Sequence, residues 1–457
     1  MRYFFYLLIL AISFHNCSEP VGYNIQCKVE GLNNATVFLS YYYGETSYVA
    51  DTARSNEKGE FRFEGTEPLH PGVYAVTQHT NTLFNLVIGA DQHFSLKTKP
   101  LDYNGNMSVS GDHDNDLYFD YLKYDARQRQ HAQELAAVVG DSTAAPAKRQ
   151  EARRELDALR NEVVQYQRNV VDKNPGTTTA VLFKAGLPSE PSDSSFQEYK
   201  HHYFDNFDLG NEILIRMPYP VYQDKVNDYL DNLVPPNADS VIMAIEEMVA
   251  MAKENQETYK YLVLKCMEKY QRPSVMGMDR VFVHLIDTYL LSGEMDFWAN
   301  DQLKKNLKAI ADPIRNSMVG MKAQNLIMED MGGKMRSLYD IKSKYTVVYF
   351  FDPDCGMCQK ETPKLKKFYN DNKQKMGVEV FAVSVDTSLW KNKEYVRDAG
   401  VKWITVNASR AKTEDYKTLY EAVTTPAIYV LDDQKTILAK KIGTESIEAI
   451  VQNHQTN

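Results

Sequence analysis

Two cysteines separated by two residues, Cys355 and Cys358, are the side chains in this sequence best suited to chemistry. They follow the apolar run Tyr345 to Phe351 and a short acidic segment, and a helical pattern starts at Gln359. This spacing places both thiols at the first turn of a helix, within reach of a disulfide bond. Unpaired N–H groups and the positive end of the helix dipole favour a thiolate at the first cysteine. The pattern predicts thiol–disulfide exchange in which the first cysteine attacks and the second resolves the mixed disulfide.

Cysteine pairs at this spacing also bind zinc or haem, but the rest of the sequence does not support either site. A structural zinc site needs a second pair, whereas Cys27 and Cys266 are isolated in the sequence. Covalent haem attachment needs His directly after the second cysteine, and Gln359 stands there. A peroxidatic cysteine of the usual peroxiredoxin type would have Pro seven residues upstream, where this sequence has Val348.

The remaining metal-ligating residue types favour structural roles. His201 and His202 lack a matching carboxylate or cysteine pattern, which favours a solvated helix face over a metal site. Cys27 and Cys266 are interpreted as unpaired buried thiols, with a disulfide between them as the alternative in an oxidising compartment. We therefore predict no metal site.

The composition limits the classes of protein that this chain can form. A length of 457 residues predicts about three domains. With 43% hydrophobic and 25% charged residues, the chain is neither fully disordered, collagen-like nor a polytopic membrane protein. A net charge of -9 provides no electrostatic footprint for nucleic acid, and it argues against an anionic membrane surface as the main partner. Five cysteines are too few for a disulfide scaffold.

The first residues predict export. Arg2 precedes the twelve-residue apolar run Tyr3 to Phe14, which is too short to span a bilayer as a helix but suits a secretory signal. Cys17 then stands where a bacterial lipoprotein carries its lipidated cysteine, although Phe14 and Asn16 depart from the residues usual before it. We predict a signal peptide of lipoprotein type over 1–17 and lipidation at Cys17. A plain cleaved signal and a buried N-terminal helix are the alternatives.

The hydrophobic patterns predict a multidomain chain. Residues 18–112 contain short alternating runs rich in Tyr, Phe and Val, which predict an antiparallel β-sandwich-like domain. Residues 113–176 contain two long helical patterns, which predict an antiparallel helical hairpin with one apolar seam. Residues 177–313 predict a helical domain, so that the middle region is all-α.

The last zone, residues 314–457, changes to β–α alternation. Four apolar runs separated by helical stretches predict an α/β domain with a mostly parallel sheet. These runs are Tyr345 to Phe351, Val378 to Val385, Trp403 to Val406, and Ala427 to Leu431. The cysteine pair follows the first of them.

The segment from Gly320 to the C-terminus resembles the thioredoxin fold and, within it, the TlpA/ResA-like exported thiol-disulfide oxidoreductases. Cys355 and Cys358 match the redox pair of that family, which implies nucleophilic and resolving roles, respectively. Glu361, three residues past the second cysteine, matches a glutamate credited with tuning proton transfer at the active site. The resemblance implies no cofactor beyond the redox-active disulfide between the two cysteines.

The resemblance also implies a substrate-binding surface. Thr425 and Pro426 match the cis-proline loop of the fold, which lies beside the cysteines and offers main-chain hydrogen bonds to an extended substrate. A cis peptide fits because X–Pro bonds adopt it at low cost. Gly356 and Met357, between the cysteines, complete the expected substrate-binding residues, and Pro426 is also expected to be catalytic.

Some residues depart from the family pattern. Asp354 stands where Trp usually precedes the first cysteine, and Tyr349 replaces the buried Asp of cytosolic thioredoxins. Asp352 and Asp354 add negative charge near Cys355, which should raise the pKa of its thiol. Since strong oxidants need a very stable thiolate, we predict a reducing or isomerising site.

Two classes of function follow from these patterns. The first is an envelope-tethered oxidoreductase that exchanges disulfides with exported proteins and receives electrons from a membrane or periplasmic donor. The second is a non-catalytic binding or scaffold lipoprotein with a passive thioredoxin-like module. The β-rich and helical segments resemble uncharacterised domains that precede thioredoxin-like domains in bacterial envelope lipoproteins. They leave oligomerisation open, and no nucleic-acid partner is expected.

Overall fold

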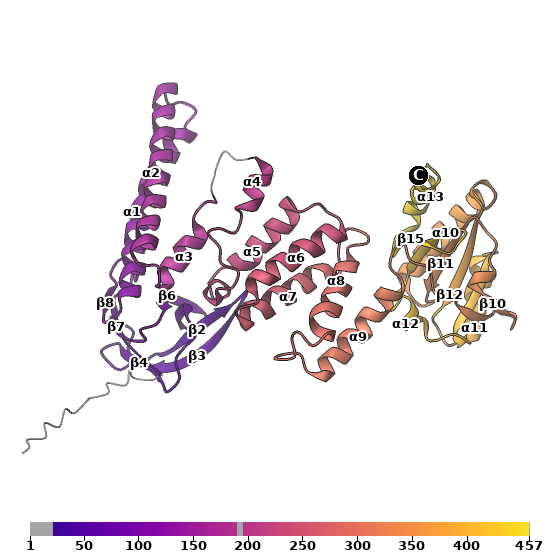
Figure 1. Ribbon diagram of the computed structural model, residues 1–457, viewed down its shortest axis with the longest axis horizontal. Helices are drawn as coiled ribbons and strands as arrows, with labels where there is room; N and C mark the ends of the chain where they lie inside the picture. The colour runs from indigo at the N-terminus through magenta and orange to yellow at the C-terminus, as the bar shows by residue number, and fades with distance from the viewer. Residues whose placement is uncertain (1–21, 190–194, 457) are drawn as a thin grey trace, which may run out of the picture. The chain divides into compact units, whose positions relative to one another are not determined.

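The computed structural model describes residues 22–189 and 195–456. The predicted signal segment and Cys17 lie outside these residues. The chain divides into two compact units, Met1–Tyr229 with Met251–Thr258, and Leu230–Ala250 with Tyr259–Asn457. Figure 1 colours the chain by residue number. Within the described ranges, none of the helices combines the length and the apolar character needed to cross a membrane.

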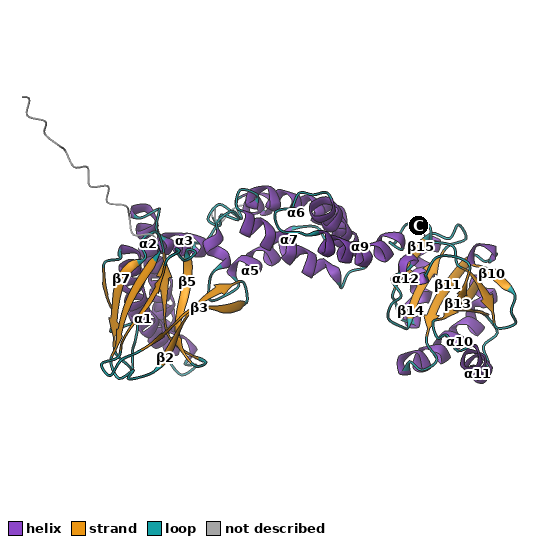
Figure 2. Ribbon diagram, turned by 90° about the horizontal axis from the view of Figure 1, so that it is seen from below, coloured by secondary structure: helices purple, strands orange, loops and turns teal. Residues whose placement is uncertain are grey.

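The first unit begins with two four-stranded sheets, shown as orange strands in Figure 2. Their strand orders are β4-β1-β7-β8 and β3-β2-β5-β6. Alternation along β4 buries Phe61 and Phe63 and exposes Glu60, Arg62 and Glu64, as expected for a half-buried strand. The predicted β-sandwich-like domain is confirmed, although β1 also pairs with β7 in parallel. The strands are β1 (Tyr23–Val29), β2 (Thr36–Tyr43), β3 (Thr46–Arg54), β4 (Glu60–Gly65), β5 (Gly72–Gln78), β6 (Asn81–Ile88), β7 (His93–Thr98) and β8 (Ser108–Ser110).

Two long helices, α1 (His113–Gly140) and α2 (Pro146–Lys173), follow the sheets and lie side by side as a hairpin (Figure 1). The Asp112 side chain caps α1 by accepting hydrogen bonds from the N–H groups of Asp114 and Asn115. Pro146 starts α2, where its missing N–H costs no helical hydrogen bond. Tyr124 and Tyr166 stack across the hairpin with ring centroids 4.4 Å apart.

The middle region is helical, as the sequence predicts. Pro313 lies inside α9 and does not end it, because the helix continues to Asn316. The helices of this region are α3 (Thr178–Gly186), α4 (Phe196–His201), η1 (Glu212–Ile215), α5 (Val221–Asp228), η2 (Tyr229–Leu233), α6 (Ala238–Ala252), α7 (Gln256–Gln271), α8 (Asp279–Leu285), η3 (Ile286–Leu291) and α9 (Asp301–Asn316).

The second unit ends in a seven-stranded sheet of order β10-β9-β13-β12-β11-β14-β15. The pairs β11–β12 and β12–β13 are parallel, and the other four pairings are antiparallel. The prediction of a mostly parallel sheet was therefore wrong. The β–α alternation holds from β11 to β13, but the chain then returns through a four-residue helix and ends the sheet with the antiparallel pair β14–β15.

The strands of this sheet are β9 (Ile327–Asp330), β10 (Met335–Ser337), β11 (Tyr345–Phe351), β12 (Val378–Ser384), β13 (Ile404–Ala411), β14 (Ala427–Leu431) and β15 (Ile437–Lys440). The helices are η4 (Leu338–Asp340), α10 (Gly356–Met376), α11 (Leu389–Ala399), α12 (Tyr416–Leu419), η5 (Thr444–Ser446) and α13 (Ile447–Thr456). All seven residues of β11 are buried, as expected for a central strand covered on both faces.

Two apolar clusters cover the two faces of this sheet. One joins β11 to α10 through Cys358, Leu365 and Tyr369, and Figure 2 shows α10 and α11 on the same side. The other joins β11 to the α12 segment through Tyr416 and Tyr420. The central strand thereby carries a rigid helix, α10, whose first turn holds the cysteine pair.

A buried ion cluster joins the helical segment of the second unit to its sheet. The ammonium group of Lys440 contacts the Asp279 carboxylate, and it lies 3.1 Å from Oε2 of Glu421. The Lys440 and Asp279 side chains are only 6% and 8% exposed. Because a buried charge needs a partner, each of these groups depends on the other.

Candidate redox site

Cys355 is the N-cap residue of α10, directly after strand β11 and the turn that follows it. Its sulfur accepts a hydrogen bond from the backbone N–H of Cys358, with a distance of 3.4 Å between N and Sγ. Cys355 is half-buried, whereas Cys358 is fully buried, and both are free thiols. The accessible cysteine therefore lies at the helix N-terminus and the protected one lies within its first turn, as the two predicted roles require.

The loop that precedes β14 lies against the first cysteine. The Cys355 thiol donates a hydrogen bond to the Thr425 carbonyl oxygen at 3.3 Å. The Thr425–Pro426 peptide is cis, as the sequence predicts, and both residues are half-buried. Gly356 and Met357 are exposed beside them, with Met357 61% exposed. The structure thus brings four of the predicted substrate-binding and catalytic residues to the surface around Cys355.

The predicted rise in the pKa of Cys355 was wrong. Burial of the thiol acts to raise its pKa, but hydrogen bonds with the side chain and backbone of Cys358, the Thr425 side chain and the Met357 backbone outweigh this effect and hold the pKa below its ordinary value. The carboxylate of Asp354 is exposed and forms an ion pair with Lys391. Local sequence did not show this cation, because it comes from a different helix.

Lys391 also balances the wider acidic group at this site. The carboxylates of Asp352, Asp354 and Asp386 have oxygens within 4.8 Å of one another. Lys391 Nζ lies 2.6 Å from Asp354 Oδ2 and 3.0 Å from Asp386 Oδ2. These contacts raise the pKa of Lys391, and its hydrogen bond contributes to the lowered pKa of Asp386. The ammonium group therefore serves as the counter-charge of the cluster.

The net pKa shift of the second cysteine has the opposite direction, because burial dominates there. Burial raises the pKa of the Cys358 thiol to about 11, so this thiol is protonated at neutral pH. The two cysteines consequently differ in exposure and in acidity. A protein disulfide that approaches the site meets the more acidic, accessible thiol first.

Three hydroxyl groups lie beneath the first turn of α10. Thr362 Oγ1 is 2.9 Å from the hydroxyl of Tyr349 and accepts a hydrogen bond from the hydroxyl of Tyr395 at 2.7 Å. Both tyrosine hydroxyls are also 3.4 Å from the carbonyl oxygen of Cys358. Burial raises the pKa of both tyrosines, which keeps them protonated as donors. This network ties β11 and α11 to the turn that carries the cysteines.

Glu361 is buried, with 7% of its surface exposed, and interacts with two partners. Its Oε1 accepts a hydrogen bond from the Thr444 N–H at 2.8 Å, and its Oε2 lies 3.0 Å from Lys364 Nζ. Burial acts to raise the pKa of this carboxyl, but these two contacts outweigh it and lower the pKa. Glu361 therefore keeps a negative charge on the helix that bears the cysteines.

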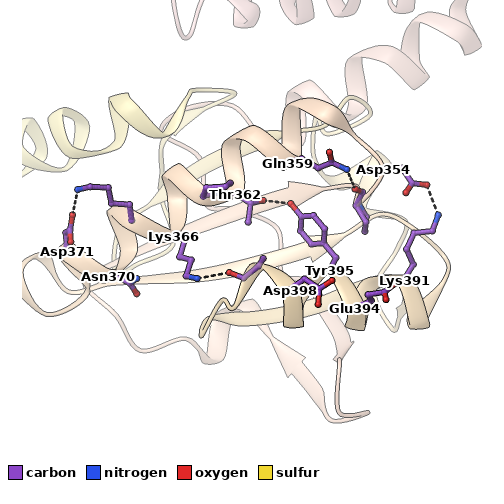
Figure 3. A pocket seen from close by; sticks show the side chains of 14 residues that line it. Asp354, Gln359, Thr362, Lys366, Asn370, Asp371, Lys391, Glu394, Tyr395 and Asp398 are labelled. Carbon is purple, nitrogen blue, oxygen red and sulfur yellow. Dashed lines mark hydrogen bonds and ion pairs between the residues drawn. The ribbon is translucent and has the colours of Figure 1, made fainter.

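A groove of about 720 Å³ lies between α10 and α11, beside the acidic cluster. Figure 3 shows Thr362 and Tyr395 directed toward each other within it, and Lys391 directed toward Asp354. At its other end, Lys366 donates a hydrogen bond to the carbonyl oxygen of Ala399 at 2.7 Å. The groove places the Tyr395 side chain of the hydroxyl network next to solvent.

Sequence reasoning missed Lys391, Thr362, Tyr395 and Thr444 as parts of the site. Thr362 could have been found, because it lies four residues after Cys358 and residues at this spacing share one face of a helix. The others approach from elements that come later in the chain, so local patterns carried no signal for them. Away from this site, Cys27 and Cys266 are buried free thiols, as interpreted from the sequence.

Three segments of the chain match families of proteins. Residues 319–440 match the AhpC/TSA family. Residues 23–118 match a domain of unknown function, DUF4369, and residues 191–312 match another, DUF5106. The family with a described chemistry thus covers the seven-stranded sheet and the cysteine pair.

The curated relatives are thiol-disulfide oxidoreductases named ResA. The protein from Bacillus thuringiensis (strain Al Hakam) is 25% identical over 175 residues, which are 38% of this chain and 95% of that protein. The one from Bacillus subtilis is 27% identical over 125 residues, 27% of this chain and 68% of that protein. A solved domain of a possible thiol-disulfide isomerase from Cytophaga hutchinsonii is 37% identical, with a TM-score of 0.29, and covers 31% of this chain and 95% of that one.

The sheet order, the position of the cysteine pair and these relatives define the class as a thioredoxin-fold thiol-disulfide oxidoreductase. The chain is multidomain, with β-rich and helical parts before this domain. Within the class, its C-terminal domain is TlpA/ResA-like, as the similarity to the ResA proteins indicates.

Proposed function

We propose that the protein is an envelope-tethered enzyme that exchanges disulfides with exported proteins through Cys355 and Cys358. The observation that carries this proposal is the asymmetry of the pair. Cys355 Sγ is accessible, caps α10 and lies 3.3 Å from the Thr425 carbonyl oxygen, whereas Cys358 is fully buried behind it. In this proposal, a substrate disulfide reaches only the Cys355 thiol. The Cys358 thiol then attacks the mixed disulfide and releases the substrate from Cys355.

The reaction that we propose proceeds in two displacements. The Cys355 thiolate attacks one sulfur of a substrate disulfide, forming a mixed disulfide and releasing the other substrate sulfur as a thiolate that takes up a proton. Cys358 loses its proton and attacks the Cys355 sulfur, which forms the Cys355–Cys358 disulfide and releases the second substrate thiol. Two electrons pass from the pair to the substrate, and a membrane or periplasmic dithiol donor must return them. No further cofactor enters these steps.

The residues around the pair have supporting roles in this proposal. Thr425 and Pro426, together with Gly356 and Met357, form the surface that would receive an extended substrate beside the nucleophile. Glu361 would tune proton transfer during the second displacement, since its charge lies on the same helix, three residues after Cys358. These assignments rest on the family resemblance and on the positions described above.

We propose reduction or isomerisation as the direction of exchange. The groups that lower the pKa of Cys355 are hydrogen-bonding partners, and the nearby cation, Lys391, pairs with carboxylates. Strong oxidants need a very stable thiolate, which a neighbouring cation commonly provides, and the causes of the lowered pKa of Cys355 include no cation. The site therefore favours a donor of electrons over an oxidant.

The cellular setting that we propose is a membrane-anchored lipoprotein that faces the periplasm. The support is the apolar run before Cys17 and the similarity to ResA proteins. Cys17 would carry the lipid. Mass spectrometry of the membrane-extracted protein tests this, because a diacyl modification on Cys17 supports the anchor and an unmodified N-terminus contradicts it.

The first experiment is the equilibrium reduction potential of the Cys355–Cys358 pair in the purified protein against glutathione. A potential near or below about -270 mV, the value of thioredoxin, supports an electron donor. A potential near about -120 mV would instead indicate an oxidant. The Cys355→Ser/Cys358→Ser variant serves as control, and full cellular function in that variant would favour the scaffold alternative.

A further inference from the structure

A positively charged pocket lies at the end of β11 opposite to the cysteines. It has a volume of about 580 Å³, and four lysines line it: Lys322, Lys342, Lys344 and Lys435. The loop before β11 and the turn between β14 and β15 form its walls. Since β11 has seven residues at about 3.3 Å each, the pocket is about 20 Å from the redox site.

Lys435 is the unusual member of this group because it is buried. Only 5% of its surface is exposed, and its Nζ has a hydrogen-bond partner in Thr346 Oγ1 at 3.1 Å. No carboxylate among the described residues lies within 4.0 Å of this ammonium group. Burial lowers the pKa of Lys435, and the charge of Lys342 lowers it further. A buried cation of this kind calls for an anion that the chain itself does not supply.

The backbone of Lys435 adds a second, independent observation. Its φ is +67°, in the left-handed region where glycine is favoured and a side chain costs energy. The turn runs from Asp432, whose carbonyl oxygen accepts the Lys435 N–H at 3.2 Å. Glycine would satisfy this turn without strain, so the lysine side chain is retained at an energetic cost.

The other three lysines of the pocket are exposed, and none has a carboxylate within 4.0 Å among the described residues. Lys322 lies over the Tyr339 ring, 4.8 Å from its centroid, and Lys342 Nζ is 3.5 Å from the Tyr339 carbonyl oxygen. Lys344 lies 5.7 Å from the Tyr345 ring centroid. Their ammonium groups consequently remain available to a ligand.

Acidic groups at the pocket are fewer. Asp433 lines it, and the charges of Asp432 and Asp433 act on Lys435 to raise its pKa, but less strongly than burial and Lys342 lower it. The Asp432 carboxylate accepts a hydrogen bond from the Thr436 N–H at 2.7 Å, which engages it in the turn. The lining therefore has an excess of positive charge in a chain whose net charge is -9.

We propose that this pocket binds a phosphate group, with Lys435 as the central ligand and Lys322, Lys342 and Lys344 as the surrounding cations. A phosphate carries more than one negative charge near neutral pH and offers several acceptor oxygens, which suits several ammonium donors that line one pocket. Ser343 lines the pocket as well and provides a hydroxyl next to Thr346, at 3.0 Å between the two oxygens. Free phosphate and a phospholipid headgroup share this chemistry.

The test uses the full chain in a buffer without phosphate. Inorganic phosphate and chloride are added at equal ionic strength, and the thermal unfolding midpoint and the binding isotherm by calorimetry are recorded. We expect phosphate to raise the midpoint more than chloride does. Lys435→Gly suits the left-handed backbone, so we expect it to fold at least as stably without ligand and to bind phosphate about tenfold more weakly or worse.

A matched control is available in Lys441. It also has a positive φ, +54°, but its Nζ is paired with Glu421 at 2.6 Å. Lys441→Gly should leave phosphate binding unchanged. Equal effects of phosphate and chloride on the native protein, or full phosphate binding by the Lys435→Gly variant, would overturn the proposal.

A second arm distinguishes the two sources of the phosphate group. Sedimentation with phosphatidylglycerol vesicles is compared with sedimentation with phosphatidylcholine vesicles, for the native chain and for Lys435→Gly. If the native chain sediments with phosphatidylglycerol vesicles and the Lys435→Gly variant does not, the ligand of the pocket is a lipid headgroup. If the native chain binds inorganic phosphate but does not sediment with these vesicles, the ligand is a free phosphate.

Discussion

Lys391 Nζ lies 2.6 Å from Asp354 Oδ2, so a lysine of α11 neutralises the carboxylate directly before Cys355. The Cys355 thiol keeps a pKa below its ordinary value because its hydrogen bonds outweigh burial. Since Lys391 pairs with the carboxylate next to the nucleophile, we predict that it weakens the effect of this negative charge on the thiol.

Lys391→Met should raise the pKa of Cys355, since the charges of Asp354 and Asp386 would then act on the thiolate unopposed. The pH dependence of thiolate absorbance measures this pKa in a Cys358→Ser background. Lys393→Met removes an exposed lysine two residues further along the same helix and should leave the pKa unchanged. An unchanged pKa in the Lys391 variant would show that the ion pair has no influence on the thiol.

Alkylation should distinguish the two cysteines of the pair. With iodoacetamide under native conditions, Cys355 should react and Cys358 should not, because Cys358 is buried and has a pKa of about 11. Because the pKa of Cys355 is lowered, its alkylation rate should rise with pH and become constant at a lower pH than for an ordinary cysteine. Well below this pKa, the rate should fall about tenfold for each pH unit. Peptide mass spectrometry identifies the modified residue, and modification of Cys358 first would contradict the assignment of roles.

The buried hydroxyl network should contribute to stability. Thr362→Val leaves the hydroxyls of Tyr349 and Tyr395 with only their longer contacts to the Cys358 carbonyl oxygen, and we expect a loss of about 1–3 kcal/mol in the free energy of unfolding. Urea titration measures this loss. Thr405→Val is the matched control, because the Thr405 hydroxyl is buried without a hydrogen-bond partner among the described residues. The Thr405→Val substitution should leave the free energy of unfolding unchanged or raise it. Equal losses in both variants would show that the hydroxyl network does not contribute to stability.

The buried ion cluster predicts a larger effect. Lys440→Met leaves the Asp279 carboxylate buried without its cation, which should lower the free energy of unfolding by about 3–5 kcal/mol. Lys440→Met combined with Asp279→Leu removes both charges and should recover most of this loss. Lys367→Met, at an exposed pair with Asp371, should leave the unfolding transition in place. Denaturant unfolding of these variants, of Asp279→Leu alone and of the native protein compares these effects, and additive losses in the double variant would argue against a direct pair.

Much of the redox site could be predicted from the sequence because its signals are local. The run Tyr345 to Phe351 forms a strand with those bounds, and the spacing of Cys355 and Cys358 fixes them at the first turn of the next helix. Thr425–Pro426 was identified through the resemblance to the thioredoxin fold, from its place before the run Ala427 to Leu431. The strand and the first turn of the helix are each determined by a short stretch of residues.

The parts that sequence reasoning missed depend on contacts between distant segments. The pKa of Cys355 was given the wrong direction because its hydrogen-bond partners include Thr425, which approaches from a loop much later in the chain. The mixed sheet was predicted as mostly parallel because the antiparallel return of β14 depends on how the chain crosses after β13. The strand at Trp403 to Val406 was predicted too short, since β13 continues to Ala411 along its partner β9. Periodicity contains no information about any of these three pairings.

The contact between Lys440 and Asp279 also limits where this chain can be divided. The matched family begins at residue 319, forty residues after Asp279, so a fragment cut at that boundary would carry Lys440 away from one of its two carboxylates. The same holds for exchange of the redox domain between relatives, because a transplanted sheet would bring the lysine and leave the aspartate behind. Evolutionary shuffling of this domain therefore has to move α8 and α9 with it, or replace Lys440 by an apolar residue.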